Sequence, residues 1–318
     1  MFDRIISVDW SGAATENDGV DLRVATFDAL TGISTILDRP YGRPGIRSWT
    51  RAIFRRWIIE QLNPKAPPTI VAMDFGFGLP WGSDQAVFGV NGWRAMIRTI
   101  AEMYELNETA RATAQAVNDT ERFEGHGPYR FDENRNDFRF YIGNGVAYYR
   151  LAELVVPQAN SQWNLCKSKG AVGFHSINGV AMLDYLIQLR DDRTIDFVIW
   201  PQESNQPDGK KHCLVESYPA ICPMLCCPGC QTPYLPRSSD GPYLPRRCTN
   251  CLELGGWRDG HQEDAWKVLQ MLVTKNLNGS LPELFEILEQ DFGRISNVNF
   301  QTQIGFEGWI IGLNGGAQ

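Results

Sequence analysis

The sequence predicts an α/β fold in which helices flank a mixed β-sheet, and its first 75 residues carry most of the evidence. An apolar segment over residues 5–9 is followed by an alternating one over residues 20–27 and a third over residues 33–37. Alternating apolar and polar residues are typical of a half-buried strand, and short links between strands favour an antiparallel meander. A helix and a further strand over residues 69–73 complete the order β-β-β-α-β.

The helix of this series is predicted from its apolar spacing and its boundaries. Apolar residues recur at the helical period between residues 53 and 62, Ser48 stands before them as an N-cap, and Pro64 follows. Further helices are predicted over residues 91–116, from Ser176 onward after a glycine-containing loop at 170–176, and from 259 to about 275. Strands are predicted at 197–200 and 213–216. Ser280 and Glu283 form a capping box that predicts a last helix ending near Phe292.

Composition and charge exclude several classes of protein. Hydrophobic residues make up 43% of the 318 residues, but no segment approaches the roughly 20 apolar residues that span a bilayer. The N-terminus lacks a secretory signal pattern, so we expect a cytoplasmic protein without membrane association. The formal net charge of −7 argues against coating nucleic acid through bulk electrostatics. It does not exclude a nuclease, whose carboxylates are offset by bound cations.

Two of the predicted strands end in an aspartate that is followed by small residues. Asp9 ends the first strand and Asp74 follows the strand at 69–73. An aspartate in a buried strand is costly unless it is paired, hydrogen-bonded or bound to a metal. Asp264 lies in the first turn of the predicted helix 259–275, on the face that should pack on the sheet, with His261 one turn earlier on the same side. We therefore expect Asp264 to point inward toward the strand ends.

These carboxylates predict a site for a hard cation. Asp9, Asp74 and Asp264 are the expected ligands of Mg²⁺ or Mn²⁺, which prefer carboxylates and water, and Glu216, at the end of another apolar segment, is the expected fourth catalytic residue. Two cations about 3.5–4 Å apart would activate a water and stabilise the leaving oxygen of a phosphodiester. The alternative is that each aspartate caps a helix or turn, and that Glu216 is a buried salt-bridge partner.

The order of the aspartate-bearing elements resembles the ribonuclease H-like fold. More narrowly, six segments are similar to the motif series of domain-of-unknown-function family 429, whose members are described as predicted ribonuclease H-like nucleases. These segments are SVDWSG at 7–12, AMDFGFGLP at 72–80, GAVG at 170–173, VESYP at 215–219, DA at 264–265 and EGWI at 307–310. The resemblance covers nearly the whole chain. It implies that Asp9, Asp74 and Asp264 bind the catalytic metal and that Glu216 lines the same site.

Six of the eight cysteines fall in one segment that we do not associate with the common core of that family. Two C-x-x-C pairs, separated by 17 residues, have the spacing of a four-thiolate zinc ribbon; they are Cys227, Cys230, Cys248 and Cys251. The ligand set of this structural zinc site stays open, because Cys222 or Cys226 is either a further candidate ligand or a small buried residue. Arginines and tyrosines in the same segment would form either a surface that touches a nucleic-acid strand or a solvated face; they are Arg237, Arg246, Arg247, Arg258, Tyr234 and Tyr243.

We therefore expect one ribonuclease H-like domain over residues 1–318, with a helical insertion after the Asp74 strand and an inserted zinc-ribbon module at 222–255. The expected function is metal-dependent hydrolysis of phosphodiester bonds in DNA or RNA. One alternative is an ATP-binding phosphotransferase of the actin and sugar-kinase type. That fold needs two ribonuclease H-like halves, whereas the sequence shows one β-β-β-α-β series. The other is a non-catalytic binding protein in which the carboxylates hold a structural cation. The sequence does not indicate the oligomeric state.

Overall fold

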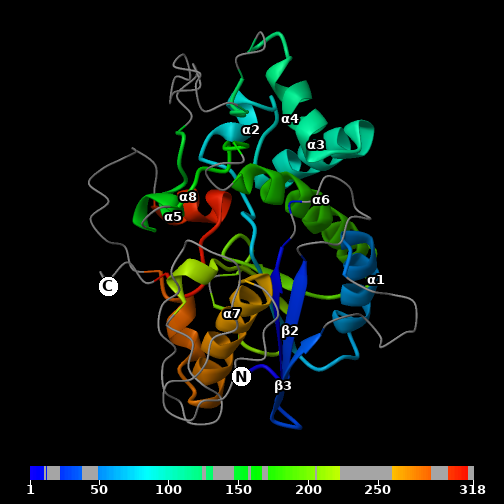
Figure 1. The fold of residues 1–318 in the computed structure, drawn as a ribbon, viewed down its shortest axis with the longest axis vertical. Helices are drawn as coiled ribbons and strands as arrows, with labels where there is room; N and C mark the ends of the chain where they lie inside the picture. Colours follow the sequence, from blue (N-terminus) through cyan, green and yellow to red (C-terminus); the bar gives the residue numbers. More distant parts are fainter. Residues whose placement is uncertain are drawn as a thin grey trace.

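The computed structural model describes residues 1–10, 12, 22–37, 49–123, 127–131, 147–156, 159–166, 171–204, 206–222, 260–287 and 300–313. Within these ranges six strands form one mixed sheet in the order β3-β2-β1-β4-β6-β5 (Figure 1). The strands are β1 Arg4–Asp9, β2 Arg23–Asp28, β3 Ile33–Leu37, β4 Thr69–Met73, β5 Val198–Trp200 and β6 Cys213–Glu216.

The pairing of the strands confirms the predicted order of the first 75 residues. β1, β2 and β3 form an antiparallel meander, and α1 (Arg51–Gln61) leads to β4, which pairs in parallel with β1. β6 continues the sheet in parallel beside β4, and β5 adds a parallel edge strand. The described chain therefore has an α/β fold whose mixed sheet resembles the ribonuclease H-like topology.

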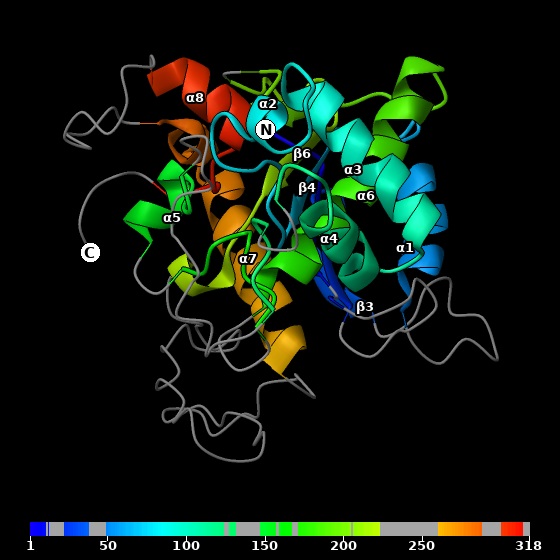
Figure 2. The same cartoon turned by 90° about the horizontal axis from the view of Figure 1, so that it is seen from above.

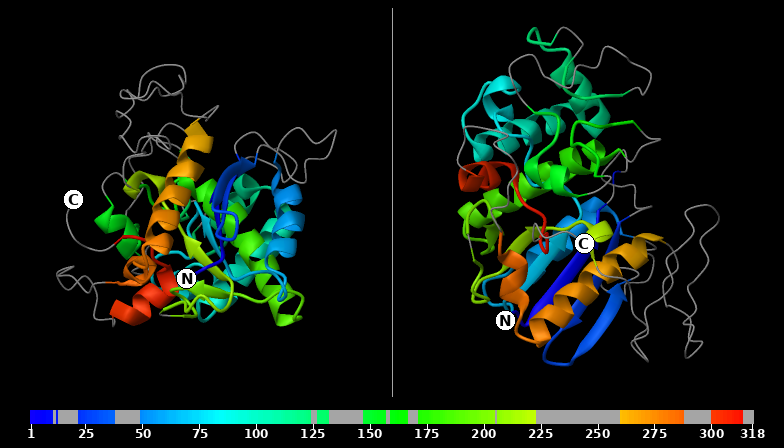
Figure 3. Two further views of the ribbon diagram at one scale, coloured as in Figure 1. Left: turned by 90° about the horizontal axis from the view of Figure 1, so that it is seen from below. Right: turned by 90° about the vertical axis from the view of Figure 1, so that its left-hand side faces the viewer.

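The sheet has a hydrophobic core on each face. Alternate residues of β1 point to opposite faces: Ile5 packs in a core that includes Val268 and Leu272 of α7 (Gly260–Leu277), whereas Ile6 packs with Phe54 of α1 and other residues on the opposite face. Figure 2 shows α7 on one side of the strands and α1, α3 (Trp93–Asn107) and α6 (Val172–Asp191) on the other. The left view of Figure 3 shows the same layers from below.

The remaining helices surround this sandwich. α2 (Ser83–Ala86), α3 and α4 (Ala110–Asn118) follow β4 in the chain and lie together at one end of the molecule (Figure 1). They correspond to the helical insertion expected after the Asp74 strand. α5 (Leu151–Val155) and α8 (Phe300–Glu307) complete the set of α-helices within the described ranges, and short 3₁₀ turns occupy Pro219–Ile221 and Leu281–Phe285. No helix in these ranges is both long enough and apolar enough to span a membrane.

Two helix starts differ from the sequence-based prediction because other side chains cap or pack there. The cap of α1 is Thr50, whose side chain accepts a hydrogen bond from the Ile53 N–H at 3.1 Å, so the expected cap at Ser48 is wrong. α6 begins at Val172, not at Ser176. Gly173 lies in the first turn of this helix. The residue is a glycine because a Cβ there would lie 2.7 Å from the carbonyl oxygen of Gln162. The glycine serves a close approach between backbones rather than a loop.

Two further helices were predicted incorrectly. The long helix at 91–116 is two helices, because Glu108 adopts a left-handed backbone with φ of 62° and the Thr109 side chain caps α4 by accepting from the Ala112 N–H at 3.1 Å. Ser280 caps no helix through its side chain and precedes a 3₁₀ turn. Its hydroxyl donates to Asn278 at 2.5 Å instead. The remainder of that predicted helix, residues 288–292, lies outside the described residues.

Candidate functional site

Three carboxylate residues stand at the same edge of the sheet. Asp9 is the last residue of β1, Asp74 follows β4, and Glu216 is the last residue of β6. The parallel register places Val8 beside Met73 and Met73 beside Glu216. The carboxyl ends of these neighbouring strands therefore meet, as the positions of the aspartates in the sequence suggested.

Asp9 and Asp74 form a hydrogen-bonded pair of carboxyl groups. Asp9 is only 5% exposed, and this burial raises its pKa from 3.8 to about 6. Burial raises the pKa of Asp74 well above its ordinary value, and the charges of Asp9 and Asp264 raise it further. Two neighbouring carboxylates disfavour each other's ionisation, so this pair stays protonated to a higher pH than two isolated aspartates would.

His261 joins the start of α7 to this pair. Its Nδ1 atom lies 2.6 Å from Oδ2 of Asp9, and its ring is 45% exposed. The hydrogen bond and the charge of the ring lower the Asp9 pKa, against the larger effect of burial. The sequence had placed His261 on the same side of the helix as Asp264, but not among the site residues.

Asp264 lies near the pair but does not point fully inward. Its charge raises the pKa of both Asp9 and Asp74. Its side chain is 40% exposed, and its Oδ1 accepts a hydrogen bond from Nζ of Lys267 at 3.2 Å. The expectation that it would be turned away from water is therefore wrong in part, because the carboxylate is drawn toward Lys267, one turn further along the helix.

Tyr218 and Cys222 lie on the side of the site that follows β6. Burial raises the pKa of the Tyr218 phenol, and the charges of Asp74 and Asp264 raise it further. Burial raises the pKa of the Cys222 thiol to about 12, and its Sγ lies 3.9 Å from the Tyr218 carbonyl oxygen. Both side chains are therefore within reach of the electric field of Asp74 and Asp264, which sequence reasoning did not anticipate.

Glu216 is held by an arginine. Its two carboxylate oxygens accept hydrogen bonds from Nη1 and Nη2 of Arg150 at 2.8 and 2.6 Å, and Oε2 also accepts from the Phe77 N–H at 3.0 Å. Glu216 has the same strand parity as Leu214, which packs in the core opposite α7. Its contacts are those of the buried salt-bridge partner considered from the sequence, and a role beside a bound metal stays a prediction.

Three buried charged residues around Glu216 were missed from the sequence. Arg150, Glu153 and Glu307 are each no more than 5% exposed and contact one another through side-chain or backbone atoms. The spacing of Arg150 and Glu153 is the i,i+3 spacing of a helical ion pair, which is the one local signal that could have indicated them. Glu307 appears in the family resemblance, but nothing local indicates its partners.

The predicted zinc ligands cannot be placed against this site. Cys227, Cys230, Cys248 and Cys251 lie outside the described residues, as do Cys226 and the arginines and tyrosines of the same segment. The zinc module at 222–255 therefore stays a prediction.

The donor chemistry of the aspartate pair fits a hard divalent cation. Mg²⁺ is usually bound by one or two carboxylates and keeps several waters, and Asp9 and Asp74 provide such a pair. Within the described ranges no group of three or more His, Cys, Asp or Glu side chains is arranged to hold a metal ion as it stands. The joint ligand set of Asp9, Asp74 and Asp264 stays a prediction.

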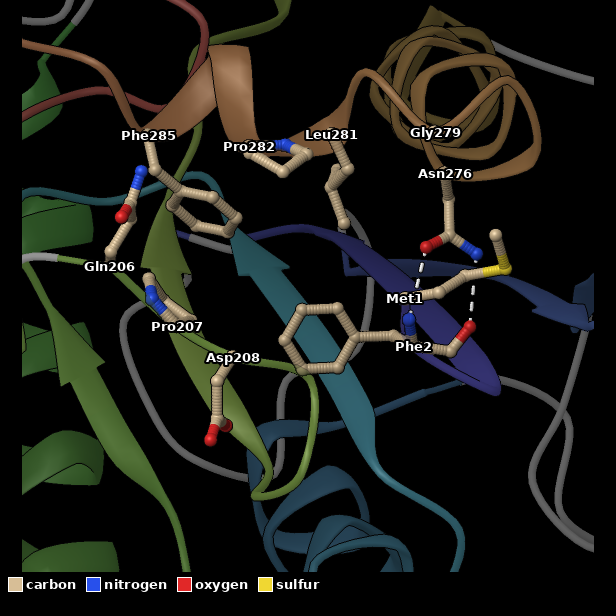
Figure 4. Close-up of a pocket in the computed structure, with 10 residues that line it drawn as sticks. All are labelled: Met1, Phe2, Gln206, Pro207, Asp208, Asn276, Gly279, Leu281, Pro282 and Phe285. Carbon is tan, nitrogen blue, oxygen red and sulfur yellow. Dashed lines mark hydrogen bonds between the residues drawn. The ribbon is translucent and has the colours of Figure 1, made fainter.

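A separate pocket of about 380 Å³ lies at the start of β1 rather than at its end (Figure 4). Its lining includes Met1, Phe2, Asn276 and Phe285. The Asn276 amide accepts from the Phe2 N–H at 3.0 Å and donates to the Phe2 carbonyl at 2.9 Å. This buried amide is thus used to fix the start of β1, and the pocket does not share residues with the carboxylate site.

Comparison with known proteins identifies no relative: no family model, no curated protein and no solved structure matches this chain. The sheet topology alone therefore supports the likeness to the ribonuclease H-like fold.

Proposed function

We propose that this protein is a divalent-cation-dependent phosphodiesterase that acts on a nucleic acid, with Asp9 and Asp74 as cation ligands. The observation that carries the proposal is the hydrogen-bonded pair of these two carboxyl groups at the carboxyl edge of a ribonuclease H-like sheet. The six sequence segments that resemble domain-of-unknown-function family 429 fit the same activity, although no family model matches the chain.

A divalent cation would relieve the electrostatic repulsion within the pair. Asp9 and Asp74 both have raised pKa values, and the charge of Asp264 adds to their repulsion. A divalent ion would offset this repulsion. Asp9 and Asp74 would hold Mg²⁺ or Mn²⁺, with Asp264 as a third ligand. Such an ion, when bound, lowers the pKa of a water and polarises a phosphoryl oxygen.

Neighbouring side chains supply the other requirements of the reaction. His261 fixes the orientation of Asp9 through its hydrogen bond. Lys267, which contacts Asp264, places a positive charge at the rim, where the phosphate of a substrate would approach. The charges of Asp74 and Asp264 act on the Tyr218 phenol, which would contact the sugar or base beside that phosphate. The predicted zinc module, with its four cysteines, would bind the nucleic-acid strand through its arginines and tyrosines.

The test is cleavage of labelled single-stranded and double-stranded DNA and RNA, and of an RNA–DNA hybrid, with Mn²⁺ or Mg²⁺. We expect cleavage that stops with a chelator and falls at least about 100-fold in Asp74→Asn. ATP turnover without cleavage would instead support the kinase-type alternative, although the described residues form one ribonuclease H-like sheet and not two. The proposal is wrong if the wild-type protein neither cleaves these substrates nor responds to millimolar Mn²⁺ or Mg²⁺ in its melting temperature.

A further inference from the structure

The loop that carries Asp74 away from β4, residues 74–81, is packed too tightly to shift without disturbing its neighbours. A Cβ at Gly76 would lie 2.7 Å from the Gln162 side chain, and one at Gly78 would lie 2.5 Å from the Phe306 carbonyl oxygen. The Phe77 carbonyl accepts a hydrogen bond from the Trp93 indole at 2.7 Å. The position of the Asp74 carboxyl group therefore depends on what holds this loop.

A buried guanidinium group stands at the centre of the contacts that hold it. Arg150 is 1% exposed, and its head group donates to Glu153 at 2.8 Å, to both oxygens of Glu216, and to the Glu307 carbonyl at 3.0 Å. We call Arg150, Glu153, Glu216 and Glu307 the arginine cluster. All four of its members are buried.

Each glutamate of the arginine cluster is linked to a different point of the Asp74 loop, two of them directly and Glu153 through Gln162. Glu216 accepts from the Phe77 N–H at 3.0 Å, and Glu307 accepts from the Trp81 N–H at 2.8 Å. Glu153 accepts from the Gln162 side-chain amide at 2.6 Å, and that amide packs against Gly76. One buried arginine thus organises three braces on one short loop.

The charges of the arginine cluster are costly for stability alone. The carboxylates of Glu153 and Glu216 share the Arg150 guanidinium, whereas the carboxylate of Glu307 accepts from backbone and side-chain N–H groups. Burial raises the pKa of Glu153 and of Glu307, so burying these carboxyl groups carries a cost. Replacing buried ion pairs by apolar residues is often neutral or stabilising. A buried cluster of one arginine and three glutamates is therefore better explained by the geometry that it imposes on the loop.

We propose that Arg150, Glu216 and Glu307 are positioning residues: they fix the Asp74 loop so that the Asp74 carboxyl group faces Asp9. The part of this inference that concerns a cation held by the two aspartates rests on the proposed function. The bracing itself concerns the metal-free protein and is measurable without a cation.

The test compares Glu216→Gln with Asp184→Asn, a matched loss of one buried carboxylate away from the site. Asp184 is 3% exposed and pairs with Arg98 at 3.0 Å. In metal-free protein we expect Glu216→Gln to speed hydrogen exchange of the Phe77 amide and its loop neighbours at least about 10-fold. We expect the same variant to weaken Mn²⁺ binding, measured by calorimetric titration, at least about 10-fold. Asp184→Asn should lower the melting temperature and change neither quantity.

The outcomes separate this inference from the proposed function. Unchanged hydrogen exchange of the loop in Glu216→Gln overturns the positioning role. If Mn²⁺ binding is nevertheless weaker in that variant, Glu216 is a direct ligand of the cation. Faster exchange with unchanged Mn²⁺ affinity also overturns the positioning role. If the wild-type protein binds no Mn²⁺ but the loop exchange of Glu216→Gln is faster, the proposed function fails and the bracing stands. If Glu216→Gln does not fold, Glu307→Gln replaces it, with the Trp81 amide as the reporter.

Discussion

The Nδ1 atom of His261 lies 2.6 Å from Oδ2 of Asp9, although 252 residues separate them in the chain. This contact joins the first turn of α7 to the last residue of β1. Because α7 covers β1 and β2, the helix delivers its histidine and Asp264 to the strand end together. The contact orients the Asp9 carboxyl group and lowers its pKa against the larger effect of burial.

Replacing His261 by alanine should raise the pKa of Asp9 above its value of about 6. The reason is that the hydrogen bond and the charge of the ring lower this pKa, while burial, which raises it, remains. A carbon-detected NMR titration of the Asp9 carboxyl group measures the change. His212→Ala is the control, since His212 accepts from the Thr69 N–H at the opposite end of the sheet. An Asp9 pKa that is equal in both variants would contradict this account.

The free energy of unfolding of the metal-free protein should fall between pH 4 and pH 7 because of Asp9. Its pKa is raised from 3.8 to about 6 in the folded protein, so the folded state binds the proton more tightly than the unfolded state. This contribution is fully present below pH 4 and is lost as pH rises through 6. The difference between the two pKa values corresponds to about 3 kcal/mol.

Asp9→Asn should remove this pH dependence and melt no lower than the wild-type protein at pH 7.5 without metal. Urea unfolding at several pH values measures both effects, with the exposed Asp3→Asn as a control. A wild-type profile that is flat from pH 4 to 7, or an Asp9→Asn variant that loses stability at pH 7.5, would show that Asp9 is only a structural cap.

Mn²⁺ should raise the melting temperature of the wild-type protein and not that of Asp74→Asn. Binding to the folded state alone stabilises it by about 2.7 kcal/mol at 100 times the dissociation constant. The increase should shrink as pH falls toward 6, because protons compete for the Asp9 and Asp74 carboxyl groups. Differential scanning fluorimetry at pH 6 and pH 8 measures this. Asp184→Asn should respond to Mn²⁺ like the wild-type protein.

The sequence predicted the parts of the fold and site that depend on local pattern. The meander, α1 and β4 follow from alternation and helical spacing, and Asp9 and Asp74 were recognised because each ends an apolar strand. The choice of Thr50 over Ser48 as a cap and the break at Glu108 were missed, because neighbouring residues of similar propensity compete there.

The arginine cluster could not have been predicted in this way. Its contacts join residues that are 66 and 157 positions apart in the chain, from Arg150 to Glu216 and to Glu307. No local period encodes such contacts, since they arise only when the loops beyond the sheet edge pack together. The exposure of Asp264 was misjudged for a related reason. Helical periodicity predicts which face of α7 carries Asp264, but it does not predict how deeply that side chain is buried in the folded protein.

The purified protein should carry one zinc ion per chain, bound by Cys227, Cys230, Cys248 and Cys251. Structural zinc contributes roughly 10–16 kcal/mol of apparent binding free energy in small peptides, so Cys248→Ser should unfold the module locally. The main sheet should survive, because the described residues of its two cores lie almost entirely on strands and helices outside this segment. Elemental analysis of protein purified without chelator measures the zinc, and its absence would contradict the prediction. Cys213→Ser, in β6, should keep the zinc.

Replacing Arg150 by methionine should destabilise the folded protein by ~3–5 kcal/mol, because it leaves the buried carboxylates of Glu153 and Glu216 without the guanidinium group that pairs with them.

The loss of stability in Arg150→Met should be smaller at pH 5 than at pH 8. Burial raises the pKa of Glu153 and Arg150 opposes that rise, so removing the guanidinium raises the Glu153 pKa further. The stability that Glu153 contributes is then present at low pH and lost as pH rises through its raised pKa. Arg98→Met is the matched control: Arg98 is 45% exposed, so losing its ion pair with Asp184 should cost less than about 1 kcal/mol. Urea unfolding of both variants at the two pH values decides the matter. Equal losses for Arg150→Met and Arg98→Met would mean that the contacts of Arg150 with Glu153 and Glu216 contribute no more to stability than an exposed ion pair.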